Sequence, residues 1–227
     1  MEHFVSVFPY IFSALPLTLF MMLASLLAGA ALGLLFALIR IRRLPVLRQG
    51  ATVLISFIRG TPPLVQLFLV FYGLPKIVEL FGLNINNWDK VVFSIITFSF
   101  IGGAYYSEMF RSAYQAVPTA QTEAALSVGL TGWSSFYHII LPQTFAILLP
   151  LLGNSVTNVL KETSLAFTIG VSDIMGKAQL EIGRTYGVAA LQTYLEVSLI
   201  YWLICLAVGK GVILLEEIFK KGHTGLA

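Results

Sequence analysis

The feature that most constrains this chain is the length of its uncharged apolar stretches. No acidic or basic residue occurs between Phe4 and Ile39, and shorter apolar stretches recur along the chain. A helix needs about 20 apolar residues to cross a bilayer, and the first stretch alone exceeds that length. Hydrophobic residues make up 57% of the chain and charged residues 11%, whereas roughly a quarter of an average soluble domain is charged. The sequence therefore predicts an all-α, polytopic membrane protein.

We expect five membrane-spanning helices within a single transmembrane domain that covers residues 1–227. The expected spans are Ser13–Ile39, Ala51–Pro75, Val91–Ser107, Gln143–Leu160 and Gly187–Gly209. The residues before Ser13 are expected to lead into the first span at the interface, because the uncharged stretch is longer than one span needs. A signal peptide is not expected, since a basic start and a cleavage site are lacking. A single cysteine excludes an internal disulfide framework, and three scattered histidines indicate no metal site.

The positions of Lys and Arg predict the orientation of these spans. Four arginines follow the first span, and cytoplasmic loops carry an excess of basic residues; they are Arg40, Arg42, Arg43 and Arg48. Alternation of the spans then places most of the 14 Lys and Arg residues on the same side. We expect an N-terminus outside and a C-terminus in the cytoplasm. The net charge of +3 is too small to indicate a nucleic-acid partner.

The second apolar stretch is interrupted by Arg59, Gly60, Thr61 and two prolines. A helix that began at Pro62 would rise only ~21 Å before Pro75, less than the hydrocarbon core of ~30 Å. We therefore expect a helix break at depth, with the prolines in the first turn of a new helix. Such a helix start could face a substrate carboxylate. Alternatively, Arg59 reaches the cytoplasmic surface and the prolines merely start the span.

The fourth span carries a polar stripe. Asn154, Asn158 and Glu162 follow one another at single-turn spacing, and Lys161 and Ser164 lie near the same end. Polar residues inside a span are candidates for function, and this set suits an amino-acid zwitterion. Hydrogen bonds between the helices of two subunits explain the stripe equally well.

Two other spans show patterns that favour packing or anchoring. Glu108 and Arg111 are three residues apart, so they can pair on one helix face, as at an anchored helix end. The first span repeats small residues every four positions, which allows close helix approach, although small residues are common in such helices. The small residues are Ser25, Gly29, Gly33 and Ala37.

A polar-flanked segment, residues 117–142, separates the third and fourth spans. Pro118 ends the preceding helix, and Thr119 with Glu123 fits a capping box for a short new helix. Gly129 suits the left-handed position at its end, and Thr131 can start the next helix. A mostly small-faced helix of this kind can dock in a groove of a partner or lie on lipid.

The spacing of this segment resembles the cytoplasmic coupling loop of membrane subunits in bacterial ABC-type importers. The matching residues are Glu123, Ala124, Ala125, Gly129, Ile139, Leu141 and Pro142. Residues 57–62, 107–111 and 160–165 are similar to polar amino acid ABC permeases, so the resemblance covers about residues 10–220. Pro63 and Ala120 depart from the family pattern, which more often has an aliphatic residue and a glycine there.

This resemblance implies a permease subunit in the bacterial cytoplasmic membrane, surrounded by lipid and working by alternating access. It implies two ATP-binding subunits at the coupling loop, a second permease subunit and an extracytoplasmic amino acid-binding protein. The chain should bind no cofactor itself, with ATP and Mg on the partner ATPase. The absence of a G-x-x-x-x-G-K-[ST] phosphate loop from the sequence agrees with a non-enzymatic subunit.

Residues 160–168 most resemble those of cystine-type permeases, which makes L-cystine the first candidate among polar amino acids. Two hypotheses from other classes remain open at this point. A passive channel or structural membrane subunit would have no ATPase partner. A proton-coupled carrier would lose uptake with the proton gradient while ATP remained.

Overall fold

The computed structural model describes residues 2–41 and 45–223, and no strand occurs in these ranges. Arg42 and Arg43, on which the orientation argument partly rests, lie outside the described residues. The helices are α1 (Glu2–Phe12), α2 (Leu15–Ile41), α3 (Pro45–Gly60), α4 (Pro63–Phe68), η1 (Leu69–Gly73), α5 (Leu74–Glu79), α6 (Lys90–Ala116), α7 (Thr119–Ser127), α8 (Gly132–Ser135), η2 (Phe136–Ile140), α9 (Leu141–Thr163), η3 (Ser164–Ile169), α10 (Ile174–Arg184) and α11 (Ala190–His223).

Five spans form if the bent pair made by α3 and the run from Pro63 to Glu79 is counted as one. Four other stretches are long and apolar enough to cross a membrane, namely Val7–Ile41, Lys90–Ala116, Gly132–Ile169 and Ala190–Leu214. This layout agrees with the predicted order of spans, but the helices extend beyond the predicted bounds. The third, α6, continues past Ser107 to Ala116. Its charges do not end it, because Glu108 pairs with arginines of α2 and α3 and Arg111 pairs within α6.

The centre of the fold is the close contact between α2 and α6. All four small residues of the predicted row on α2 are buried. A Cβ added at Gly33 would lie 2.7 Å from the Cβ of Tyr106 on α6, and one at Gly103 would lie 2.9 Å from the Cβ of Leu32. Side chains at these positions would push the helices apart, so the predicted packing face is confirmed.

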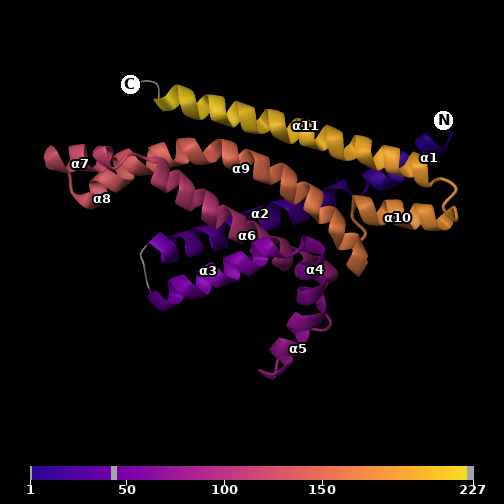
Figure 1. The fold of residues 1–227 in the computed structure, drawn as a ribbon. Helices are drawn as coiled ribbons and strands as arrows, with labels where there is room; N and C mark the ends of the chain where they lie inside the picture. Colours follow the sequence, from indigo (N-terminus) through magenta and orange to yellow (C-terminus); the bar gives the residue numbers. More distant parts are fainter. Residues whose placement is uncertain (1, 42–44, 224–227) are drawn as a thin grey trace.

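The remaining spans surround this pair (Figure 1). Helix α9 packs against α6, α2 and α11, whereas α3 packs against α2 and α6 on the other side of the pair. The α7–α8 segment and the C-terminal end of α11 lie toward one end of the molecule, and α1 and α10 lie toward the other (Figure 1). The chain thus passes from end to end as a multi-span membrane protein does.

The predicted break in the second span is present between α3 and α4. The two halves are bent by 115°, and α4 begins at Pro63 after an extended Pro62. The buried side chain of Gln66 stabilises the bend, because its Nε2 donates hydrogen bonds to the carbonyls of Ile58 at 2.7 Å and Thr61 at 2.9 Å. These carbonyls lack helical partners where α3 ends.

At the end of the molecule that carries α1, α10 is tied to the first span. Its N-cap residue Asp173 is fully buried, and the Ile174 amide donates to Thr18 Oγ1 at 3.3 Å. Lys177 donates to Ser13 Oγ at 2.5 Å and lies 4.9 Å from the ring centroid of Tyr10. These contacts fix α10 across the junction of α1 and α2.

Candidate functional site

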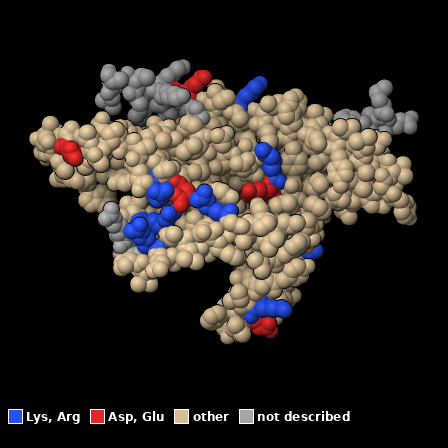
Figure 2. Space-filling view, in the orientation of Figure 1, with Lys and Arg blue, Asp and Glu red and all other residues tan. Residues whose placement is uncertain are grey.

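Glu108 on α6 is the centre of an ion-pair cluster that joins three helices. Its carboxylate lies 2.5 Å from Arg40 on α2, 2.8 Å from Arg111 on α6 and 3.7 Å from Arg59 on α3. The predicted Glu108–Arg111 pair is therefore confirmed, but it is one part of a larger network. Charged side chains gather over α3 and α6 on the face drawn in Figure 2. Three cations around one carboxylate leave net positive charge at this point.

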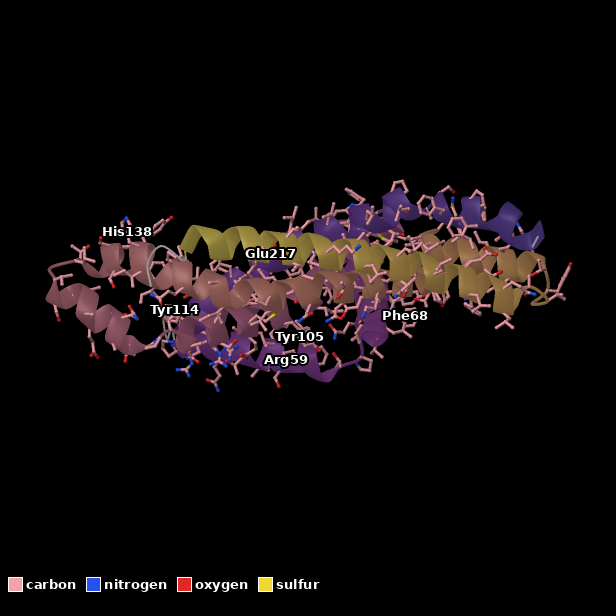
Figure 3. The ribbon with its side chains drawn as sticks, turned by 90° about the horizontal axis from the view of Figure 1, so that it is seen from above. Arg59, Phe68, Tyr105, Tyr114, His138 and Glu217 are labelled. Atoms are coloured by element: carbon pink, nitrogen blue, oxygen red, sulfur yellow. The ribbon has the colours of Figure 1, made fainter. Side chains whose placement is uncertain are left out.

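A cavity of about 440 Å³ opens beside this cluster. Arg59 lies at its wall with its Cζ 5.6 Å from the ring centroid of Tyr105, a cation–π contact. Figure 3 shows these two residues next to each other near the lower edge of the molecule in that view. The cavity is lined by Arg40, Thr52, Ile55, Ser56, Arg59, Gly60, Tyr105 and Glu108. A guanidinium that is half exposed at such a wall can bind a carboxylate.

A second cavity, of about 330 Å³, lies between α6 and α9. Two of its polar lining residues, Asn158 and Glu162, belong to the predicted stripe of the fourth span. The full lining is Ile101, Gly102, Tyr105, Tyr106, Met109, Ser155, Asn158, Val159 and Glu162. Carboxylate and amide oxygens at one wall suit an ammonium group.

Tyr105 lines both cavities. The first cavity presents Arg59 and the second presents Glu162, so groups of opposite charge lie on the two sides of one tyrosine. This arrangement can hold a molecule that carries a carboxylate and an ammonium at the same time.

Other residues that the sequence marks as candidates for substrate contact do not line these two cavities. Asn154 and Lys161 are exposed on α9, and Ser164 donates its hydroxyl to the Lys161 carbonyl at 2.6 Å. Thr61 lies at the helix break, where its hydroxyl donates to the Phe57 carbonyl at 2.9 Å, and it lines a shallower depression with Gly60. The polar stripe is thus divided, since Asn158 and Glu162 face the cavity whereas Asn154 does not line it.

The segment between α6 and α9 forms a compact helical hairpin at one end of the molecule (Figure 1). The Leu130 amide donates to the Ala125 carbonyl at 3.1 Å, and the Gly129 amide donates to the Leu126 carbonyl at 3.0 Å. With φ of +87° at Gly129, this is a Schellman motif. The predicted left-handed glycine is confirmed, as is the helix start at Thr131, whose hydroxyl accepts from the Ser134 amide at 3.2 Å.

The predicted capping box is wrong. Helix α7 already includes Thr119, its N-cap is Pro118, and no side chain caps it. Pro118 fixes the extended backbone that precedes a helix, without offering a side-chain acceptor. The helix therefore begins at Thr119, one residue earlier in the chain than predicted. Glu123 therefore lies past the first turn, on the exposed face of α7.

The hairpin offers a continuous exposed surface. Glu123, Ala124 and Gly129 are exposed, whereas Ala125 is buried against the second half of the hairpin. Ile139, Leu141 and Pro142 are partly buried where the hairpin joins α9. Large side chains extend the surface, and they are Leu126, Val128, Trp133 and Tyr137. An exposed helix with small residues flanked by aromatic rings is suited to insertion into a groove.

Sequence reasoning missed several residues of the two cavities. In the sequence Arg40 indicates only the orientation of the spans, and no pattern within one helix marks Tyr105, Tyr106 or Ser155 as lining residues. Their roles depend on which helices meet, which the spacing within one helix does not reveal. The two adjacent tyrosines next to a charged pair were the available signal.

Comparison with known proteins gives consistent results. Residues 29–212 match the family described as binding-protein-dependent transport system inner membrane component. The L-cystine transport system permease protein TcyL of Bacillus subtilis (strain 168) is 39% identical over 216 residues, covering 95% of this chain and 90% of that protein. The probable amino-acid permease protein YxeN of the same organism is 38% identical over 223 residues, covering 98% and 95%.

Two solved structures are also similar. A crystal structure of an amino acid ABC transporter with histidines superposes with a TM-score of 0.83 at 31% identity, covering 95% of this chain and 97% of that one. The MetNI methionine ABC transporter superposes with a TM-score of 0.69 at 13% identity, covering 96% and 99%. The second likeness concerns the fold alone.

Proposed function

The chain belongs to the family of binding-protein-dependent transport system inner membrane components, and we propose that it moves a polar amino acid, with L-cystine as the first candidate. It is a permease subunit of an ABC importer, and ATP hydrolysis belongs to a separate subunit. The 39% identity to an L-cystine permease supports the proposed cargo. The observation that carries the mechanism is the exposed, Schellman-capped helix α7, which lies between the candidate spans Lys90–Ala116 and Gly132–Ile169.

In this mechanism the two ATP-binding subunits hold the hairpins of two permease subunits. The coupling residues are Glu123, Ala124, Ala125, Gly129, Ile139, Leu141 and Pro142. Of these, Glu123, Ala124 and Gly129 are exposed to the ATPase, whereas the buried Ala125 holds the hairpin together. Closure of the ATPases on ATP and Mg moves the hairpins. Because the hairpin continues directly into α9, its movement reaches the wall of the second cavity, where Asn158 and Glu162 lie.

The two cavities accommodate opposite ends of the amino acid. The guanidinium of Arg59 binds the carboxylate, and the carboxylate of Glu162 with the amide oxygen of Asn158 binds the ammonium. Gly60 and Thr61 keep the helix break open beside the first cavity, while Asn154, Lys161 and Ser164 contact cargo on the way in or face the second permease subunit. The sharing of Tyr105 by the two cavities supports this placement.

The orientation follows from the basic residues. The end of the molecule with α7 and the C-terminal end of α11 faces the cytoplasm of a bacterial cell, and the end with α1 and α10 faces the extracytoplasmic binding protein. A passive channel or structural subunit is the less favoured function, because it requires no exposed coupling helix.

The coupling role is tested by the variants Glu123→Lys and Gly129→Asp. Both should insert in the membrane at wild-type levels while lowering uptake of labelled L-cystine by about tenfold or more, since a charge at a docking helix opposes association and a side chain at φ +87° strains the Schellman turn. The matched control is Glu79→Lys, a charge reversal at an exposed residue that ends α5.

Two measurements decide the result. Uptake is followed in cells that lack the chromosomal copy, and co-purification of an ATPase with the permease is followed in mild detergent. Wild-type uptake by both variants would contradict the coupling role. Failure of wild-type permease to bring down any ATPase would favour the channel. Deleting the chain should abolish uptake of its cargo. If L-cystine uptake is unchanged by the deletion, the cargo is another amino acid.

A further inference from the structure

Arg59 is held more loosely than the other two arginines of the ion-pair cluster around Glu108. Arg40 lies 2.5 Å from Glu108 Oε1, and Arg111 donates from Nε and Nη2 to Oε2 at 3.0 and 2.8 Å. Arg59 approaches Oε1 only to 3.7 Å, which is beyond hydrogen-bond distance. Its side chain is also the most exposed of the three, at 45% against 15% and 33%. Arg59 can therefore leave the carboxylate of Glu108 without breaking a hydrogen bond to it.

The helices that carry the arginines explain this difference. Arg111 follows Glu108 by three residues on α6, and Arg40 ends α2, the helix that packs closely on α6. Arg59 instead lies in the last turn of α3, beside the 115° break. Its Cζ is 5.6 Å from the ring centroid of Tyr105. This cation–π contact does not involve Glu108, so the guanidinium keeps one support at the cavity wall when the ion pair separates.

The cavity of about 440 Å³ gives a ligand access to the same guanidinium. Arg59 and Glu108 both line it, together with the exposed Ser56 of α3. A water molecule takes up about 30 Å³ in the liquid, so the space is large enough for a carboxylate group. A carboxylate that binds Arg59 here lies near the carboxylate of Glu108. Because like charges repel, each of the two weakens the hold of the other on Arg59.

Glu108 is not left unpaired when Arg59 turns to a ligand. Arg40 and Arg111 still contact its two oxygens, so the exchange avoids the large cost of a partly buried charge without a partner. When the ligand leaves, Arg59 regains Glu108 as its partner. The exchange is therefore possible in both directions, as a protein that must bind and then release its cargo requires.

We propose that Glu108 is a positioning residue that competes with the carboxylate of the cargo for Arg59 and so promotes release of the bound amino acid. The inference rests on the proposed function, in which Arg59 binds that carboxylate, and adds the group that limits the affinity. Glu108 acts through Arg59 and does not contact the cargo. Because the competition concerns the α-carboxylate, it does not depend on the side chain of the amino acid.

The test is equilibrium binding of labelled L-cystine to the purified permease–ATPase complex without the binding protein, together with the maximal rate of uptake in cells. Glu108→Gln keeps the size of the side chain and removes its charge. It should tighten binding by about fivefold or more, because the like charge that opposes the cargo is gone. Maximal uptake should fall, since the cargo leaves more slowly. A merely structural role for Glu108 predicts the opposite, weaker binding.

The matched control is Glu181→Gln on α10. Glu181 also pairs with an arginine three residues further along its helix, at 3.6 Å, and its side chain is 16% exposed. This variant should leave binding and uptake at wild-type values. If Glu108→Gln does not fold, Glu108→Asp carries the test. It keeps a carboxylate on α6 but withdraws it from Arg59 by one methylene, so it should tighten binding to a smaller degree.

Arg59→Gln separates failure of this inference from failure of the proposed function. Weaker binding by Arg59→Gln without tighter binding by the Glu108 variants would overturn the competition alone. Tighter binding with unchanged maximal uptake would overturn the role in release. Wild-type binding by Arg59→Gln, or a wild-type complex that does not bind L-cystine, would overturn the placement of the cargo and this inference with it.

Discussion

At the scale of single residues, Asp173 is a buried carboxyl group at the start of α10, outside the apolar spans. Burial raises its pKa from the ordinary 3.8 to about 7, although hydrogen bonds from the Gly176 and Met175 amides act in the opposite direction. Between these two values the folded protein binds more protons than the unfolded chain. Its stability therefore falls as pH rises through this window, and levels off above pH ~7.

We predict that the thermal midpoint of the purified protein in detergent is higher at pH 5 than at pH 8. Asp173→Asn should flatten this dependence, because the amide retains an oxygen that accepts from Gly176 and never ionises. The control is Asp89→Asn, at the exposed N-cap of α6, where the side chain accepts from Val91. A wild-type slope in the Asp173→Asn variant would contradict the prediction.

The ion-pair cluster shows which residue contacts the sequence could predict. Glu108 and Arg111 are three residues apart on one helix, so their pairing follows from helix geometry. Arg40 and Arg59 reach the same carboxylate only because α2 and α3 both pack on α6. That approach depends on tertiary packing, which a single sequence does not specify. The same reason explains why Tyr106 was missed.

At the scale of helices, the contact between α2 and α6 depends on glycine. We predict that Gly33→Ala destabilises the protein by about 1–3 kcal/mol, because the added methyl would overlap the Cβ of Tyr106 and the backbone of α6. In a chain of this length such a loss lowers the thermal midpoint by roughly 2–10 °C. The measurement is the melting of purified protein in detergent.

The matched control is Gly209→Ala on α11, where an added Cβ meets no atom within 4 Å among the described residues. That variant should melt at or slightly above the wild-type temperature, since alanine favours a helix over glycine. Equal destabilisation by the two substitutions would show that the α2–α6 contact is not the cause.

The helix layout was largely predictable because apolar length determines where a chain crosses a membrane. The break after Gly60 and the left-handed Gly129 also followed from local chemistry, since proline and glycine restrict or permit particular backbone angles. The 115° bend and the role of Gln66 did not follow from local chemistry. The start of α7 was misjudged because Thr119 and Glu123 fit a capping box that Pro118 pre-empts.

At the scale of the whole molecule, the two ends differ in character. The end with α7 and α8 is a helical hairpin with exposed small and aromatic residues, whereas the end with α10 carries the exposed turn between α10 and α11 (Figure 1). In that turn Tyr186 is 97% and Val188 85% exposed. The proposed orientation places the hairpin in the cytoplasm and this turn outside.

The orientation is tested by labelling with a membrane-impermeant maleimide in intact cells. Cys205 is the single cysteine of the chain, so Cys205→Ser gives a background without thiols. On that background, Val188→Cys should be labelled from outside, because its position is exposed in the outer turn. Ser127→Cys, at the exposed end of α7, should be labelled only after the membrane is permeabilised. The opposite pattern would reverse the orientation and, because the ATPases act from the cytoplasm, would remove α7 from their reach.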